Sequence, residues 1–464
     1  MMGHQGVRTN PMQRRTLLAA AGVAPAFIRT LMAAERPNIV WILAEDLGPQ
    51  LGCYGYPLVE TPNIDHLAAE GVRYEHAHTT APVCSASRSA FNVGLYQTAT
   101  GTQNHRSHRT DGYRLPGGAK LVSHRLQEAG YFTANVKGEF APGTRGMAKT
   151  DFNFTAEQPF MGGHWNQRAK GQPFYAQVNF QATHKGPAFV EARKLPKLID
   201  PKSVELPPYW PDHSTVRDEF ANYLDCINLL DRNVGALIDV LKRDGLYDNT
   251  LVFFMGDNGR CLIRGKQWLY DAGTHVPMIA RWPGRAKPGT AVSDPVLSLD
   301  MTATTLAAAG VTLPAPFHGR PLWGKGAKPR QHVITARDRC DMTVDRIRCV
   351  RDTRCAFIRN FMPERPYTQF NRYIQTQYPT LGAMQELHAA GRLKGAELLF
   401  MAGRKPDFEF YDLKQDPHEI RNLAADPAHR QRIREYSAIL DEWIQSTADQ
   451  GRTPEPSEAY ADQV

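Results

Sequence analysis

The sequence predicts an α/β fold, with a large, mostly parallel sheet flanked by helices and a smaller C-terminal α+β subdomain. Between residue 37 and about 310, apolar β-branched runs alternate with segments of helical periodicity, a pattern typical of parallel strands joined by helices. The chain of 464 residues also exceeds what one hydrophobic core usually supports, so a second, smaller unit is expected.

The spacing of apolar residues, and the residues typical of element starts and ends, predict the main helices and strands. Helical periodicity predicts a helix from Thr61-Pro62 to Gly71, a long amphipathic helix over 220–241 and a final helix over about 427–447. A shorter helix is expected over 89–95. Continuous apolar runs predict four buried strands, at 38–44, 131–136, 174–180 and 250–255.

The chain is expected to divide into three parts. Residues 1–34 resemble a targeting segment, because Arg14-Arg15 precede an apolar stretch and small residues follow it. The twin arginine predicts export of the folded protein to the periplasm or the medium; a cytosolic chain with an apolar N-terminus is the alternative. Residues 35–324 are expected to form the main domain and 325–464 the C-terminal subdomain. No apolar run predicts a membrane anchor.

Composition narrows the classes of partner. The formal net charge of +8 favours anionic substrates by long-range steering. Basic residues are scattered, with no aromatic-interleaved stripe and no zinc-finger spacing, so a nucleic-acid partner is not expected. There are seven cysteines. An oxidising compartment would permit a bridge within the 340–355 cluster, but the sequence fixes no pairing.

Polar side chains follow each predicted strand of the sheet. Glu45-Asp46 follow the first and Asp257-Asn258 the fourth, while Lys137 ends the second and His184 comes after the third. In a parallel sheet these carboxyl ends form the ligand-binding edge. Carboxylates gathered there would repel one another unless a cation neutralised them, and all-oxygen ligands suit Ca²⁺ or Mg²⁺. A helix cap or solvated loop would explain any one pair alone; the recurrence favours a metal site.

Two further motifs contain potential ligands or nucleophiles. His76 and His78 form an H-x-H pair, but without a third ligand they are interpreted as ordinary loop histidines. Cys84 is expected at a helix N-terminus with Arg88 four residues on, where an anion binds. A cysteine-phosphatase loop needs five residues between the two, and here there are three, so a simple thiolate nucleophile is disfavoured. A buried structural cysteine remains open from the residues alone.

The segment Cys84-Ser-Ala-Ser-Arg88 resembles the sulfatase signature C-x-[PA]-S-R, and the resemblance extends from about residue 36 to 427. It implies an alkaline-phosphatase-like fold with a small C-terminal sheet, and some details are similar to N-sulfoglucosamine sulfohydrolases. The other segments that carry it are Arg36-Pro-Asn-Ile-Val40, Thr61-Pro-Asn-Ile-Asp65, Gly256-Asp-Asn-Gly259, Arg264-Gly-Lys266 and Asp416-Pro-His-Glu419.

The resemblance implies hydrolysis of sulfate esters or sulfamates, with a sulfated small molecule or glycan as substrate. It implies that a formylglycine-generating enzyme converts Cys84 to formylglycine, the nucleophile precursor. Lys137, His184 and Lys266 match positions that clamp sulfate and protonate the leaving atom. By position the ligands of the cation, Ca²⁺ or alternatively Mg²⁺, would be Glu45, Asp46, Asp257, Asn258 and the modified Cys84.

Two departures from the family pattern leave questions open. Glu45 stands where the family usually has aspartate. Lys137-Gly138-Glu139 stands where Lys-x-His is common, and that histidine is the usual base. Glu139, or a histidine such as His105 from elsewhere, could take its place. The alternatives to a sulfatase are a phosphate or phosphonate ester hydrolase on the same fold and an inactive relative that binds sulfated glycans.

Overall fold

β1 (Asn38–Ala44) lies near the middle of a seven-stranded sheet whose order is β4-β5-β1-β6-β7-β2-β8. The computed structural model describes residues 36–138 and 146–463. The strands beside β1 are β4 (Phe132–Lys137), β5 (Phe174–Phe180), β6 (Thr250–Gly256), β7 (Met278–Arg281), β2 (Val72–Tyr74) and β8 (Thr290–Val292).

The register of the sheet aligns the ends of its central strands. β1 is parallel to both β5 and β6, and Ala44 pairs with Phe180 on one side and Gly256 on the other. β4 is parallel to β5, with Lys137 opposite Asn179. β7 alone of these strands runs antiparallel to its neighbours. Side chains that follow β1, β5 and β6 therefore emerge at one edge.

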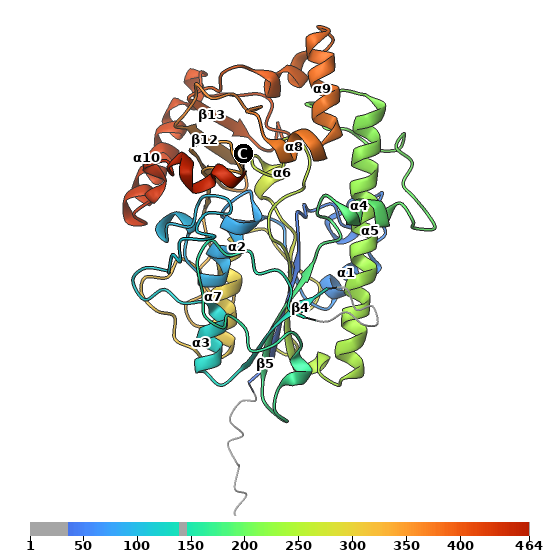
Figure 1. The fold of residues 1–464 in the computed structure, drawn as a ribbon, viewed down its shortest axis with the longest axis vertical. Coiled ribbons are helices and arrows are strands. Elements are labelled where there is room, and N and C mark those ends of the chain that lie inside the picture. The colour runs from blue at the N-terminus through green and yellow to red at the C-terminus, as the bar shows by residue number, and fades with distance from the viewer. Residues whose placement is uncertain (1–35, 139–145, 464) are drawn as a thin grey trace, which may run out of the picture. The chain divides into compact units, whose positions relative to one another are not determined.

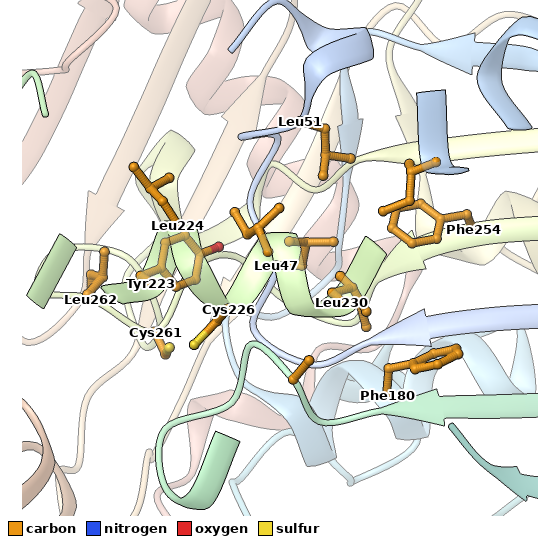
Figure 2. Packing of buried hydrophobic residues seen from close by; sticks show 14 of the residues in the cluster. Leu47, Leu51, Phe180, Tyr223, Leu224, Cys226, Leu230, Phe254, Cys261 and Leu262 are labelled. Atoms are coloured by element: carbon orange, nitrogen blue, oxygen red, sulfur yellow. The ribbon is translucent and has the colours of Figure 1, made fainter. Parts of the chain in front are cut away.

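Helices cover both faces of the sheet (Figure 1). Alternate residues of β1 enter two separate cores, Val40 and Ile42 on one face and Ile39 and Trp41 on the other, which explains its continuous apolar sequence. Figure 2 shows the first core, where Leu224 and Leu230 lie near Leu47 and Phe254. α1 (Pro62–Ala69), α4 (Pro187–Ala192) and α5 (Ser214–Arg243) cover that face; α2 (Cys84–Val93), α3 (Val122–Glu128) and α7 (Ser298–Ala308) cover the other.

A second, antiparallel sheet follows in the chain, with order β10-β11-β12-β13. Two helices interrupt it between β12 and β13, and a last helix packs against β11 and β12. Its elements are β10 (Val333–Arg337), β11 (Ile347–Arg351), β12 (Cys355–Asn360), α8 (Arg372–Gln377), α9 (Pro379–Ala389), β13 (Phe408–Asp412) and α10 (Arg430–Ser446). Three short elements complete the fold: β3 (Ala77–His78) pairs in parallel with β9 (Val296–Leu297) as a two-stranded sheet, and α6 (Asp271–Thr274) lies between β6 and β7 in the chain.

The structure confirms the four predicted strands and the three longer helices. The long helix begins earlier than predicted, at Ser214, because the His213 side chain accepts a hydrogen bond from the backbone N–H of Thr215. A helix is present where one was predicted over 89–95, but it is longer at its start: α2 begins at Cys84, which confirms the helix N-terminus expected there, and it ends at Val93, before Gly94, whose φ of 80° terminates it. The C-terminal segment begins with a 3₁₀ turn before α10.

Other expectations have mixed outcomes. Residues 36–464 form one compact unit, and the expected boundary at 324 falls between α7 and β10. The targeting segment lies outside the described residues. All seven cysteines are unpaired, so no bridge forms within the 340–355 cluster. In the parts of the chain that the structure describes, no helix has the length and apolar character needed to cross a membrane.

Candidate active site

The loops after β1 and β6 are joined by backbone hydrogen bonds. The Asp46 N–H donates to Oδ1 of Asp257 over 3.0 Å, and the Asp257 N–H donates to the carbonyl of Ala44 over 3.0 Å. Asp46 holds a φ of 55°, an uncommon conformation for aspartate that this pairing fixes. The parallel register of β1 and β6 thus brings Glu45, Asp46, Asp257 and Asn258 together, all of them buried.

Arg88 lies one turn into α2 and neutralises part of this charge. Its Nε donates to Oδ2 of Asp257 over 2.8 Å, and Nη2 lies 3.5 Å from Oε1 of Glu45. Nη1 donates to Oδ1 of Asn179, on β5, over 2.6 Å. Burial raises the pKa of Asp257 to about 6, despite the opposing effect of Arg88. Arg88 therefore links the helix that carries Cys84 to the strand-end carboxylates.

Lys266 and His184 face the same carboxylates. Nζ of Lys266 lies 2.8 Å from Oδ1 of Asp46 and 3.0 Å from Oδ2. Nε2 of His184 lies 3.8 Å from Oε2 of Glu45 and 3.9 Å from Oδ2 of Asp46, while its Nδ1 pairs with the Lys185 carbonyl at 2.8 Å. Burial, with the nearby charge of Lys266, lowers the pKa of His184. We infer a neutral imidazole that donates from Nδ1 to the Lys185 carbonyl.

The oxygens at the strand ends fit a hard cation in chemistry. Glu45 Oε2 and Asn258 Oδ1 are buried and have no hydrogen-bond partner among the described residues. Leaving such oxygens unsatisfied is costly, and a divalent cation would satisfy both. The carboxylates themselves do not form a closed set: within 36–138 and 146–463, no three His, Cys, Asp or Glu side chains converge on one metal position. Lys266 and Arg88 instead pair with Asp46 and Asp257.

Cys84 is the first residue of α2, with 1% of its surface exposed. Its side chain packs with Val83, Ala86 and Cys340, and burial raises the pKa of its thiol to about 12. An unmodified thiol here is protonated at neutral pH, which agrees with the exclusion of a thiolate nucleophile. The thiol also interacts electrostatically with Lys266 and with a second lysine, Lys149.

Lys149 and Asp151 are site residues that the sequence analysis missed. Nζ of Lys149 lies 3.1 Å from Oδ2 of Asp151 and 3.7 Å from Oε1 of Glu45. Asp151 holds a φ of 58° and also accepts from Nη2 of Arg109 over 2.6 Å. Both residues follow a loop rather than a strand. The search for polar side chains directly after predicted strands therefore did not find them. The one available signal was the Lys149-Thr150-Asp151 spacing, a Lys-x-acid pair.

The other expected residues lie as follows. Lys137 ends β4, but its side chain makes no hydrogen bond or ion pair with any described residue. Glu139 lies outside the described residues. The loop assignment is wrong for His78, which is buried in β3 and stacks on His275 with ring centroids 5.1 Å apart. His76 stacks on the same ring at 6.3 Å. The H-x-H pair is therefore part of a packed cluster of rings.

Comparison with known proteins identifies the family. The family model described as Sulfatase matches residues 37–311. An ulvan-active sulfatase of Formosa agariphila is 30% identical over 92% of this chain and 77% of its own length. Human N-acetylgalactosamine-6-sulfatase is 26% identical over 61% of this chain, and the match spans 64% of the human protein, slightly less than two thirds.

Two solved structures show the same fold at low identity. A protein in complex with its substrate D-glucosamine-2-N,6-O-disulfate has a TM-score of 0.63 and 17% identity, over 90% of this chain and all of that chain. A phosphonate monoester hydrolase from Silicibacter pomeroyi has a TM-score of 0.61 and 19% identity, over 89% of this chain and 96% of that chain. The fold is thus alkaline-phosphatase-like, and the chain belongs to the sulfatase family, the sulfuric ester hydrolases.

Proposed function

We propose that this sulfatase removes sulfate from a glycan, using a formylglycine made from Cys84 and a bound divalent cation. The observation that carries the proposal is the position of Cys84. It begins α2 one turn before the fully buried Arg88, beside Lys266 and Lys149 and next to the strand-end carboxylates. A group attached to residue 84 would be surrounded by positive charge, as a bound sulfate requires.

Formylglycine would supply an oxygen nucleophile at residue 84, and the cation would supply positive charge to the sulfate oxygens. Glu45, Asp46, Asp257 and Asn258 would hold the cation, Ca²⁺ being preferred and Mg²⁺ the alternative. The unpartnered oxygens of Glu45 and Asn258 support this ligand set. Its distinguishing feature is Glu45, whose extra methylene also lets it reach Arg88 and Lys149.

Three cations would hold the sulfate: Arg88, Lys266 and Lys149. Since Arg88 and Lys266 are almost fully buried, their charges are weakly screened and act strongly on an anion. We assign to Lys149 the role that the family resemblance gives to Lys137, because Lys149 reaches Glu45. His184 and Lys266 would orient the leaving oxygen or nitrogen and return a proton to it.

The similar proteins, the net charge and the N-terminal segment bear on the substrate and the cellular location. The similar protein from Formosa agariphila acts on ulvan, and a structural neighbour binds a disulfated glucosamine. With the net charge of +8, these favour a sulfated polysaccharide or an oligosaccharide derived from it. The twin-arginine segment supports export in the folded state, after a formylglycine-generating enzyme has acted on Cys84.

A phosphonate or phosphate ester hydrolase is the second candidate, because a phosphonate monoester hydrolase shares the fold. The test is turnover by the matured, full-length enzyme of matched p-nitrophenyl sulfate and phosphonate monoesters, together with sulfate release from ulvan oligosaccharides. We expect sulfate release to exceed phosphonate cleavage by at least about tenfold in kcat/KM, roughly 1.4 kcal/mol of transition-state binding. Faster phosphonate turnover would favour the second candidate, and no turnover of either would favour an inactive glycan-binding protein.

A further inference from the structure

A buried histidine and carboxylate form a pair beside the active site. Nδ1 of His105 lies 2.8 Å from Oδ1 of Asp341, and less than a tenth of either residue is exposed. The other oxygen of Asp341 accepts from Nε2 of Gln267 over 3.0 Å and from Nδ2 of Asn371 over 3.1 Å. Three donors thus hold this carboxylate in one orientation.

The hydrogen bonds determine which nitrogen of His105 carries the proton. Because the Asp341 carboxylate can only accept, Nδ1 of His105 is the donor in this pair. In the neutral imidazole the lone pair then lies on Nε2. Nε2 is buried and has no hydrogen-bond partner among the described residues. His105 therefore presents a buried proton acceptor that no other described side chain uses.

The pair is anchored to the segments that carry the catalytic groups. The Arg106 N–H donates to Oγ of Ser85, the neighbour of Cys84, over 2.9 Å. Gln267 follows Lys266, and its N–H donates to the carbonyl of Pro82 over 2.7 Å. Cys340, the neighbour of Asp341, belongs to the same buried cluster as Cys84. His105 and Asp341 are therefore held beside the Cys84 site, the group formed by Cys84, Arg88, Lys149, Lys266 and the strand-end carboxylates.

Asp151 connects His105 to the charged residues of the Cys84 site. It interacts electrostatically with both His105 and Cys84, and its ion pair with Lys149 leads on to Glu45. The charged groups that face His105 are Asp341 from the segment after β10, Asp151 from the loop after β4 and Arg106 from its own segment. Burial nevertheless lowers the pKa of His105, so the imidazole is neutral and can accept a proton at neutral pH.

The other titratable groups of the Cys84 site are poorer proton acceptors than His105. Arg88, Lys149 and Lys266 are cationic. Burial disfavours the charge on Asp151, but Lys149, together with Arg109 and Arg88, outweighs it and holds the pKa of Asp151 below the ordinary value, so this carboxylate is a weak base. His184 donates from Nδ1 to a backbone carbonyl rather than to a carboxylate. Of the two histidines, His105 is the one whose protonated form a carboxylate partner would stabilise through Nδ1.

We propose that His105, oriented by Asp341, is the proton-accepting residue of this site, in place of the histidine that is absent from Lys137-Gly138-Glu139. The proposal rests on the proposed sulfatase function. Hydrolysis forms a bond from sulfur to an oxygen derived from water and breaks the bond from sulfur to the alcohol oxygen. The alcohol oxygen keeps that electron pair and takes one proton. Because sulfate is a dianion at neutral pH, a second proton must leave: Nε2 of His105 accepts it with its lone pair and later releases it to solvent.

Two substitutions test separately the role of His105 as proton acceptor and the role of Asp341 in orienting it. His105→Asn places an amide N–H where Nδ1 lies, so it keeps the hydrogen bond to Asp341 and removes Nε2. Asp341→Asn offers a donor to Nδ1 and forces the proton onto Nε2, the wrong tautomer for a base. His124→Asn, on α3, is the control, because the one hydrogen bond of the His124 side chain to a described residue is with the carbonyl of Glu157.

The experiment uses the full-length matured enzyme, with formylglycine content checked by mass spectrometry. We expect both variants to lower kcat by roughly 10²- to 10⁴-fold with KM changed less than about threefold, and to remove the acidic limb of the kcat–pH profile. Independently of activity, ¹⁵N spectra of histidine-labelled protein should show an unprotonated Nε2 at His105 in the wild type and a protonated one in Asp341→Asn. His124→Asn should match the wild type.

Several results would overturn the proposal. They are a His105→Asn enzyme within threefold of wild-type kcat, a loss of kcat that leaves the acidic limb in place, or a wild-type His105 protonated on Nε2 at neutral pH. If His105→Asn does not fold, Asp341→Asn decides by the same criteria. A wild-type enzyme that carries formylglycine but releases no sulfate would contradict the proposed function instead, and the spectra would still show whether Nε2 can accept a proton.

Discussion

The residues around Cys84 form two groups, called here the two sides of the site, which the fold positions in different ways. One side consists of residues that strands and a helix position: Glu45 and Asp257 at the ends of β1 and β6, and Arg88 within α2. The other side consists of loop residues, Lys149, Asp151 and His105, together with Asp341 from the segment after β10. In our proposals the first side would hold the cation and, through Arg88, the sulfate, whereas the second side would add Lys149 to the sulfate and supply the groups that move protons.

The difference has a physical basis. The first side is fixed by backbone pairing, since β1 and β6 run parallel in register and Arg88 sits one turn from the start of a helix. The second side is fixed by side-chain bonds between distant segments, such as the pair of His105 and Asp341, which are 236 residues apart in sequence. We expect the first side to tolerate substitution of its neighbours better than the second.

The largest expected effect removes the proposed nucleophile precursor, Cys84, which begins the helix that carries Arg88 of the first side. Cys84→Ala should lower kcat by at least about 10⁴-fold, because no other group supplies the attacking atom. The fold should persist, since the loss of one buried sulfur leaves only a small cavity. Steady-state sulfate release and circular dichroism check both points. Turnover within a factor of ten of the wild type would refute the role of Cys84.

The next effect tests the cation site proposed for the first side. Incubation with excess chelator should abolish sulfate release, and Ca²⁺ should restore it. Binding should also stabilise the folded protein, by about 2.7 kcal/mol at a concentration of 100 times Kd. Thermal unfolding with and without Ca²⁺, in the wild type and in Asp257→Asn, is the matched comparison. Full activity in chelator, or equal Tm shifts in both proteins, would contradict the ligand assignment.

A smaller effect distinguishes the two lysines and so tests the second side directly. Lys149→Ala should lower kcat by roughly 10²- to 10³-fold, as expected for loss of one preorganised charge at the sulfate. Lys137→Ala should change it by less than about threefold, because Lys137 makes no ion pair in the described parts of the chain. The reverse ranking, measured on matured enzyme, would place the strand-end lysine at the sulfate.

The smallest effect concerns α6, which connects the two sheets through an ion pair of Asp271 with Arg351 on β11. His275 lies 3.1 Å from Asp271; burial opposes its protonation, but Asp271 outweighs burial and raises the pKa of His275. A raised histidine pKa stabilises the fold below the unfolded value of about 6.5, and this stabilisation is lost as the pH rises through the folded value. Urea unfolding should therefore show His275→Gln to be destabilising below pH 6.5 and progressively less so above it. A difference that grows with pH would contradict this assignment.

The sequence predicts the first side far better than the second. The residues that follow β1 and β6 could be predicted because apolar runs mark the strands and parallel strands share one edge. Lys149 and Asp151 could not, since the loop that carries them has no periodic signal. The bond from His105 to Asp341 depends on how β10 follows the first sheet in space, which local patterns do not encode. The helical pattern predicts only the later part of α2, because Cys84, Ser85 and Ser87 are weak helix formers, although Cys84 itself is expected at a helix N-terminus.

Mass spectrometry of the peptide that contains residue 84 tests the central claim most directly. The protein would be isolated after export, or after coexpression with a formylglycine-generating enzyme, and the peptide probed with an aldehyde-reactive hydrazide. The predicted result is a formylglycine at position 84 of the wild-type protein. An Arg88→Ala variant that no longer matures would carry an unmodified cysteine there. An unmodified cysteine in a preparation that releases sulfate at full rate would contradict the account.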